Sequence, residues 1–139
     1  MRRFLFDRPT HTPITDLGLL GLRLFAGLAL AVFHGTGKFP PPDWFVGAVT
    51  GMGLPAPAAF AWVGTVAELA GGLLLAIGLL TRPVAIFVLA HFLMVVTLAH
   101  AGDPLPDREL AMFYGMTAFL FALAGPGRYS LDAIVFKRR

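Results

Sequence analysis

The sequence predicts an all-α integral membrane protein: a four-helix bundle with both termini cytoplasmic and a short C-terminal amphipathic helix at the membrane interface. Hydrophobic residues make up 57% of the chain and charged residues 14%. Four long apolar stretches are present, and the basic residues are concentrated at the two tails and one turn. A soluble domain of 139 residues could not bury so much apolar surface, so lipid must solvate much of it.

We expect the helices of a single transmembrane domain, 1–139, at about 17–34, 58–80, 84–100 and 108–124. The stretches are continuously apolar rather than alternating, which indicates helices and not barrel strands. The first two have the length of about 17–25 residues that a span needs, and the other two are slightly shorter.

Turn-forming residues separate these stretches. Arg82-Pro83 divides the second from the third, a Pro-rich turn at 103–106 precedes the fourth, and Gly125-Pro126-Gly127 ends it. The segment 35–57, with Pro40-Pro41-Pro42, is predicted to be a longer interfacial loop.

The distribution of basic residues predicts the orientation. A cytoplasmic N-terminus places eight of them inside and two, Lys38 and Arg108, outside. The inner set is Arg2, Arg3, Arg8, Arg82, Arg128, Lys137, Arg138 and Arg139. We expect a helix at about 130–137 to lie on the inner surface, its basic end against anionic headgroups.

The same distribution argues against nucleic acid as a partner, because the charges form no basic face or stripe. The chain has no cysteine, which excludes disulfides, thiolate-held iron–sulfur clusters and covalently attached haem. Redox chemistry would therefore need a partner or a non-covalent cofactor.

Three ionisable residues fall well inside the spans: Arg23, Glu68 and His91. A charged side chain at the bilayer centre costs about 2.5–3.5 kcal/mol on insertion scales, so such residues usually face protein or water. Separately, Arg23 could extend to the interface, Glu68 could be protonated and His91 could be a packing residue. Their occurrence on three different helices favours one shared polar site.

Helix periodicity adds His34 and Lys38 to that site. At about 100° per residue, Arg23, Gly27, His34 and Lys38 fall on one polar stripe of the first helix. Side chains lean toward the N-terminus of their helix, and this favours His34 over Arg23 as the partner of Glu68.

His34 and His100 are predicted at similar depths, which would allow a metal or haem between the first and third helices. No residue supplies the supporting hydrogen bonds that such ligands normally have. We therefore expect no metal and no haem.

The chain resembles the DoxX family of small four-helix membrane proteins along almost its whole length. The residues that carry the likeness are Leu22-Arg23-Leu24, Phe33-His34-Gly35-x-x-Lys38-Phe39, Gly53-Leu54-Pro55, Glu68-Leu69-Ala70-Gly71-Gly72, Gly78-x-x-Thr81-Arg82 and Gly125-Pro126-Gly127-Arg128-Tyr129-Ser130-Leu131-Asp132.

The resemblance implies a four-helix bundle in the cytoplasmic membrane of a prokaryote. It also implies a link to quinone chemistry, since members are associated with quinol oxidases, thiosulfate:quinone oxidoreductases and complexes that handle oxidative stress. The motif positions that carry over are Arg23, His34, Lys38 and Glu68, whereas His91 comes from its place within a span.

Two functions follow. In the first, the protein is a subunit of a quinone-linked redox system, and Arg23, His34, Lys38, Glu68 and His91 bind the quinone or relay protons. It would need a separate redox partner, because no haem, flavin or cluster motif is present. In the second, it is a non-catalytic structural or assembly subunit of a larger membrane complex. A transporter is a weaker third candidate, since no repeat or broken span is evident.

Overall fold

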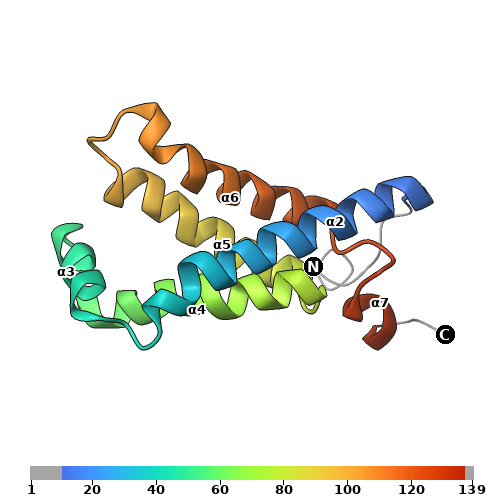
Figure 1. The fold of residues 1–139 in the computed structure, drawn as a ribbon, viewed down its shortest axis with the longest axis horizontal. Helices are drawn as coiled ribbons and strands as arrows, with labels where there is room; N and C mark the ends of the chain where they lie inside the picture. Colours follow the sequence, from blue (N-terminus) through green and yellow to red (C-terminus); the bar gives the residue numbers. More distant parts are fainter. Residues whose placement is uncertain (1–10, 137–139) are drawn as a thin grey trace.

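A computed structural model of the chain describes residues 11–136, and all regular secondary structure in that range is helical (Figure 1). The elements in order are α2 (Pro13–Ala29), η1 (Leu30–Gly35), η2 (Thr36–Lys38), α3 (Asp43–Gly51), α4 (Pro57–Ile77), α5 (Thr81–Met94), η3 (Val95–Ala99), α6 (Leu105–Ala124) and α7 (Leu131–Val135).

The first helix is longer than the predicted 17–34, because it begins at a capped turn and continues through two irregular segments. The Thr12 side chain accepts a hydrogen bond from the Thr15 backbone N–H at 3.2 Å, and Pro13 occupies the first helical position. Beyond Ala29 the helix widens into the π-helix η1 and then tightens into the 3₁₀-helix η2. The change of pitch rotates the residues after Ala29 away from the faces that a regular helix would give them.

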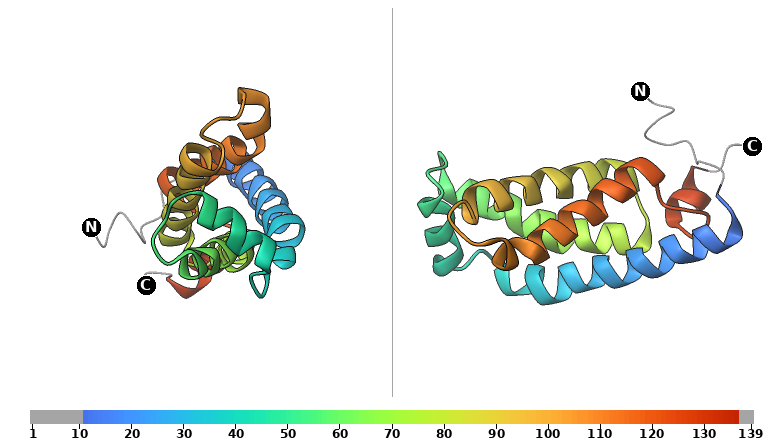
Figure 2. Two further views of the ribbon diagram at one scale, coloured as in Figure 1. Left: turned by 90° about the vertical axis from the view of Figure 1, so that its left-hand side faces the viewer. Right: turned by 90° about the horizontal axis from the view of Figure 1, so that it is seen from above.

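The segment 35–57 is not the simple loop that we expected, since it contains the nine-residue helix α3. Phe45 and Val49 on one face of α3 are buried against Ala61 of α4. The short apolar pattern of α3 lies among prolines and glycines, which hid it in the sequence. Figure 2, which looks onto this end of the bundle, shows α3 lying across the ends of the long helices.

The other helices differ from their predicted ranges by up to three residues at most ends. Helix α4 ends at Ile77, and Gly78, which caps it, adopts a left-handed conformation (φ 69°, ψ 47°) and donates its N–H to the carbonyls of Leu74 and Leu75. Helices α5 and α6 begin three residues earlier than 84 and 108. The predicted 130–137 helix is α7, shorter at both ends, and residue 137 lies outside the described range.

The long helices pack in the order α2, α4, α5, α6, with α3 at one end of the bundle and α7 at the other (Figures 1 and 2). The α2–α4 contact uses small residues: a Cβ added at Gly72 would lie 2.7 Å from the Gly27 carbonyl oxygen and 2.9 Å from the Ala31 nitrogen. Larger side chains such as Val88, Phe92 and Phe121 fill the space between α5 and α6.

The α7 end is held by the turn that follows α6. Both carboxylate oxygens of Asp132 accept hydrogen bonds at the start of α5, from the N–H groups of Leu80 at 2.7 Å and Thr81 at 2.8 Å. The Asp132 N–H donates to the Gly78 carbonyl at 2.8 Å. The C-terminal helix is thereby joined to the connection between α4 and α5.

Three helices of the described range are long and apolar enough to cross a membrane: Pro13–Lys38, Pro57–Ile77 and Thr81–Ala99, with mean hydropathies of 1.8, 1.8 and 2.0. Helix α6, with Asp107, Arg108 and Glu109 near its start, is not among them. Large apolar side chains such as Phe25, Phe33, Leu93 and Met116 are exposed on the outside of the bundle. The chain is a membrane protein whose outer helix faces contact lipid.

Candidate functional site

Glu68 lies at the centre of a buried polar cluster near the α3 end. One carboxylate oxygen, Oε2, is 2.5 Å from Lys38 Nζ, and the other, Oε1, is 3.2 Å from His91 Nε2. The three residues come from three helical segments: η2, α4 and α5. We call Lys38, Glu68 and His91 the Glu68 cluster.

The direction of the helices explains why Lys38 reaches Glu68. Helix α4 runs opposite to the first helix, so Glu68 leans toward the α3 end while Lys38, in the last turn of the first helix, leans back along it. The two side chains therefore approach each other. Thr65 strengthens this arrangement, because its hydroxyl donates to the Lys38 carbonyl at 2.8 Å.

The structure corrects the expected pairing of His34 with Glu68. His34 lies in the π-helix η1 and its ring contacts Tyr114 of α6, edge to face, with 5.4 Å between the centroids. The predicted stripe assumed a regular helical pitch from Arg23 to Lys38. Because η1 changes that pitch, His34 faces α6 whereas Lys38 faces α4.

Burial makes the Glu68 cluster electrostatically strong. Glu68 is 4% exposed and His91 6%, whereas the Lys38 side chain is 18% exposed. Charges removed from water interact more strongly than at a surface, and a buried carboxylate needs such partners. Lys38 is the most accessible member of the cluster.

Helix α3 covers this cluster from the end of the bundle. The Phe45 ring is 4.9 Å from Lys38 Nζ, measured to the ring centroid, and Phe45 is itself buried. Gly64 leaves room for the close packing, since a Cβ there would lie 3.1 Å from Phe45 Cζ and 3.3 Å from His91 Cε1. The missed helix α3 therefore forms one wall of the site.

One polar atom of the cluster has no partner. His91 Nδ1 is buried and makes no hydrogen bond within residues 11–136. If His91 Nε2–H donates to the Glu68 carboxylate, Nδ1 carries the free lone pair and is an acceptor. Buried polar atoms are nearly always paired, so this nitrogen marks a place where a bound molecule could hydrogen-bond.

Arg23, the fifth predicted site residue, lies elsewhere. Its guanidinium donates to the carbonyls of Ala76 at 3.1 Å, Pro126 at 2.5 Å and Tyr129 at 2.6 Å. Ala76 is eight residues, or about 12 Å along the helix, from Glu68. Arg23 thus joins α4 to the turn after α6 at the α7 end.

The two histidines considered for a metal or haem have different partners. His100 Nδ1 is 2.7 Å from Asp103 Oδ2 in the connection before α6, and His34 contacts Tyr114. Within residues 11–136 no group of three or more His, Asp or Glu side chains is placed to hold a metal ion.

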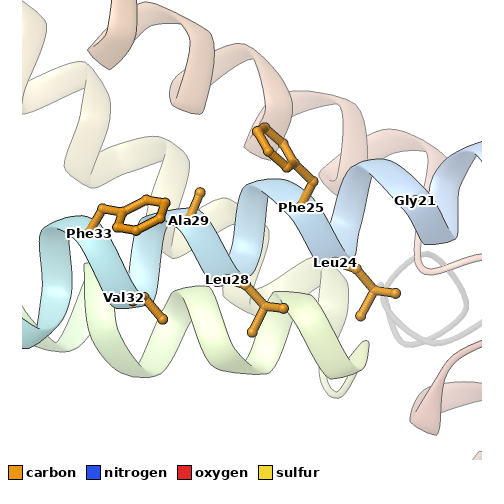
Figure 3. Close-up of a pocket in the computed structure, with 7 residues that line it drawn as sticks. All are labelled: Gly21, Leu24, Phe25, Leu28, Ala29, Val32 and Phe33. Atoms are coloured by element: carbon orange, nitrogen blue, oxygen red, sulfur yellow. The ribbon is translucent and has the colours of Figure 1, made fainter.

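An apolar groove of about 530 Å³ lies on the outside of α2 and η1 (Figure 3). It is lined by Gly21, Leu24, Phe25, Leu28, Ala29, Val32 and Phe33. None of these side chains can hydrogen-bond, so the groove suits a hydrocarbon chain and not an oxygenated headgroup. Polar side-chain groups that could bind a ligand lie instead in the Glu68 cluster.

Sequence reasoning missed Tyr114, which is buried between His34 and Phe92. The available signal was a phenol within an apolar helix, where the hydroxyl needs a partner. It also missed Lys38 as the partner of Glu68, because the stripe drawn on a regular helix favoured His34.

Comparison with known proteins places the chain in a family. A Bacillus subtilis protein named "Putative oxidoreductase CatD" is 31% identical over 88% of this chain and 90% of its own length. Rv3486, an uncharacterised membrane protein of Mycobacterium tuberculosis, is 33% identical over 84% of this chain and 80% of its own length. No solved structure matches the chain. The DoxX family's sequence profile matches residues 18–101, which include the whole Glu68 cluster, and the chain therefore belongs to the DoxX family.

Proposed function

We propose that this protein is a membrane subunit of a quinone-linked redox system and that it binds a quinone, or a similar lipophilic molecule, at the Glu68 cluster. The observation that carries the proposal is the buried Glu68 carboxylate, which contacts both Lys38 and His91. The Nδ1 atom of His91 has no hydrogen-bond partner within residues 11–136. The name of the similar Bacillus subtilis protein, which includes the word oxidoreductase, supports the redox assignment.

The chemistry of a quinone fits these three residues. Its reduction to a quinol takes up two electrons and two protons, so its site needs hydrogen-bond partners for the oxygens and a group that transfers protons. His91 Nδ1 can accept a hydrogen bond from a quinol hydroxyl, or donate one to a quinone oxygen when the imidazole is protonated. Glu68 is the proton-transferring group, and Lys38 stabilises its charged form.

We propose that a separate protein supplies the electrons. The chain has no cysteine to hold an iron–sulfur cluster, and its sequence carries no haem or flavin motif. The exposed apolar helix faces that surround the bundle leave room for such a partner within the membrane. In this assignment the chain binds and orients the quinone and transfers protons to and from it.

The proposed setting is the cytoplasmic membrane of a prokaryote, with α6 as a fourth span and both termini in the cytoplasm. Helix α6 has 20 residues, about 30 Å, and packs against α5. Its charged residues Asp107, Arg108 and Glu109 lie in its first two turns, where they can reach the membrane surface. The eight basic residues assigned to the inner side support the orientation.

Quinone binding to the purified protein in detergent tests the proposal. Trp44 and Trp62, which are the two tryptophans of the chain, lie in or beside the α3 end, so quenching of their fluorescence by a short-tailed ubiquinone or menaquinone analogue reports binding there. We expect Glu68→Gln and His91→Ala each to weaken binding by about tenfold or more, as loss of a hydrogen bond to a charged group does.

The matched control is Asp103→Asn, which removes a carboxylate that also pairs with a histidine but lies in the connection before α6. It should leave the affinity unchanged. Equal quinone affinities of wild type and Glu68→Gln, with both proteins folded, would disprove the proposed site.

A second function, a non-catalytic structural or assembly subunit, is favoured by the α7 end. There the charged side chains of Arg23 and Asp132 bind backbone groups of the chain itself, which is a structural use. On this alternative the Glu68 cluster also only fixes helix register. Glu68→Gln would then lower thermal stability or the recovery of partner proteins from mild detergent, and no quinone would bind to either form.

A further inference from the structure

Lys38 is the member of the Glu68 cluster that reaches toward solution. Its side chain is 18% exposed, whereas the side chains of His91 and Glu68 are 3% and 5% exposed. Lys38 ends the first helix, at the end of the bundle where α3 lies (Figure 1). The buried carboxylate of Glu68 is thus separated from solution at this end by one ion pair.

In the opposite direction, toward α7, close helix contacts begin about one turn beyond Glu68. A Cβ added at Gly72 would lie 2.7 Å from the Gly27 carbonyl oxygen, and one added at Gly71 would lie 2.8 Å from Val88 Cγ2. The first contact joins α4 to α2, and the second joins α4 to α5. Contacts this close leave no room for a water molecule between the helices.

Apolar side chains fill the bundle between these contacts and the α7 end. They belong to one hydrophobic cluster and are at most 5% exposed: Leu30, Leu75, Val88 and Phe121. At the α7 end itself, the guanidinium of Arg23 donates to three backbone carbonyls. An arginine side chain does not release its proton in proteins, so Arg23 does not relay protons from this end.

The titratable groups around Glu68 lead to the α3 end. Lys38 of η2 and His91 of α5 are bonded to its carboxylate. The titratable side chains of α6 and η1 on this side of the bundle, Tyr114 and His34, contact each other. Helix α3 presents an aromatic ring to the Lys38 ammonium rather than a charge.

We propose that the Glu68 cluster exchanges protons through Lys38 with the solution on the α3 side of the membrane, and not with the solution on the α7 side. The inference rests on the proposed function, in which the cluster transfers protons to and from a quinone. With the orientation proposed above, the α3 side is the outside of the cell. Oxidation of a bound quinol would then release its protons outside.

The proton balance of this route is one proton in and one proton out. For each proton that His91 accepts at Nδ1, its Nε2 gives one to the nearer oxygen of the Glu68 carboxylate. Lys38 releases a proton to water and regains one from the other oxygen of Glu68. The reverse sequence delivers a proton to a quinone.

Proteoliposomes with different pH inside and outside test this inference without a quinone. Both tryptophans of the chain, Trp44 and Trp62, are exposed at the end where Lys38 lies, so their fluorescence reports the charge of the cluster. External iodide quenches only those molecules whose α3 end faces outward, which separates the two orientations. We expect the fluorescence of these molecules to follow the external pH between about 5 and 8, where imidazole groups ordinarily titrate, and to ignore the internal pH.

Substitutions separate proton transfer from charge. Glu68→Gln should lose most of the response. Lys38→Arg keeps a positive charge beside Glu68, and it should also lose the response because a guanidinium does not release a proton. The matched control for Glu68→Gln is Asp43→Asn, the same change at an exposed carboxylate next to Trp44, which should leave the response unchanged.

A response of these molecules to the internal pH, to both solutions or to neither would overturn the inference, and so would a full response in folded Lys38→Arg. Quinone binding in detergent is a separate measurement. If Glu68→Gln weakens quinone binding but the pH response is not confined to the α3 side, this inference fails and the proposed function stands. If the response is confined to that side but wild type binds no quinone, the proposed function fails and the route of proton exchange stands.

Discussion

Arg23 and Glu68 show that two charged residues within the same bundle have different uses. Arg23 is 1% exposed, and each of its three guanidinium nitrogens donates to a backbone carbonyl. Glu68 is bonded to side chains that can change their protonation, and one of these keeps a free nitrogen. The first arrangement stabilises the fold, and the second can exchange protons.

Replacement of Arg23 should therefore affect stability and not ligand binding. Arg23→Met leaves three carbonyls without this donor, those of Ala76 and Pro126 in buried hydrogen bonds and that of Tyr129 in a partly buried one, and we expect the free energy of unfolding to fall by about 3 kcal/mol. Thermal unfolding in detergent measures this. Arg128→Met, at an exposed arginine of the adjacent turn, is the control and should change little. An unchanged melting temperature for Arg23→Met would contradict the structural role.

The sequence was informative about which residues are polar within the membrane, and less so about their partners. His91 was predicted as a site residue and lies beside Glu68, whereas Lys38 replaced His34 as the partner of the carboxylate. The pairing depends on the pitch of six residues in η1, and no residue of Leu30–Gly35 is distinctive of a π-helix. In the fold this segment packs against Leu69 and Tyr114, which are distant in the sequence.

At the scale of helices, α2 and α4 can approach so closely because they meet at glycines. A Cβ at Gly27 would lie 2.6 Å from the Gly72 carbonyl oxygen, and the reciprocal distance at Gly72 is 2.7 Å. Backbone atoms cannot move aside as a flexible side chain can. The contact therefore fixes the separation of the two helices that carry Lys38 and Glu68.

A single methyl group at this contact should destabilise the bundle. We expect Gly72→Ala to lower the free energy of unfolding by about 1–3 kcal/mol, because the helices must separate to accept it. Gly18→Ala is the matched control, since a Cβ there meets nothing within 4 Å and alanine favours the helix. If both variants unfolded at the wild-type temperature, this outcome would contradict the close contact between α2 and α4.

Hydrophobicity and turn residues predicted an all-helical fold, and the structure confirms it for residues 11–136. They were insufficient for α3, whose nine residues are too short and too close to prolines to stand out. Its role depends on a contact far along the chain, between Phe45 and the Gly64 face of α4. Long-range contacts of this kind leave no periodic signal in one sequence.

For the whole molecule, the proposed topology can be tested by chemical labelling, because the chain has no cysteine of its own. Gly47 and Gly102 have open space around an added Cβ, and Thr15 and Arg128 are exposed at the α7 end. We expect Gly47→Cys and Gly102→Cys to react with a membrane-impermeant maleimide in intact cells. Thr15→Cys and Arg128→Cys should react only after the membrane is disrupted.

This pattern tests α6 as well as the orientation, since Gly102 and Arg128 flank it. Reaction of Thr15→Cys and Arg128→Cys in intact cells, with the other two protected, would show the reverse orientation. Reaction of Gly102→Cys and Arg128→Cys on the same side would show that α6 does not cross the membrane.

The bond between Asp132 and the start of α5 has a consequence for the order of biosynthesis. The ribosome makes α5 before residue 132. The N–H groups of Leu80 and Thr81 therefore lack their hydrogen-bond acceptor, the Asp132 carboxylate, until that residue has been made. A chain interrupted after α6 would have its hydrophobic helices but would lack these two hydrogen bonds. Local opening at the start of α5 should therefore be easier in a chain that lacks Asp132.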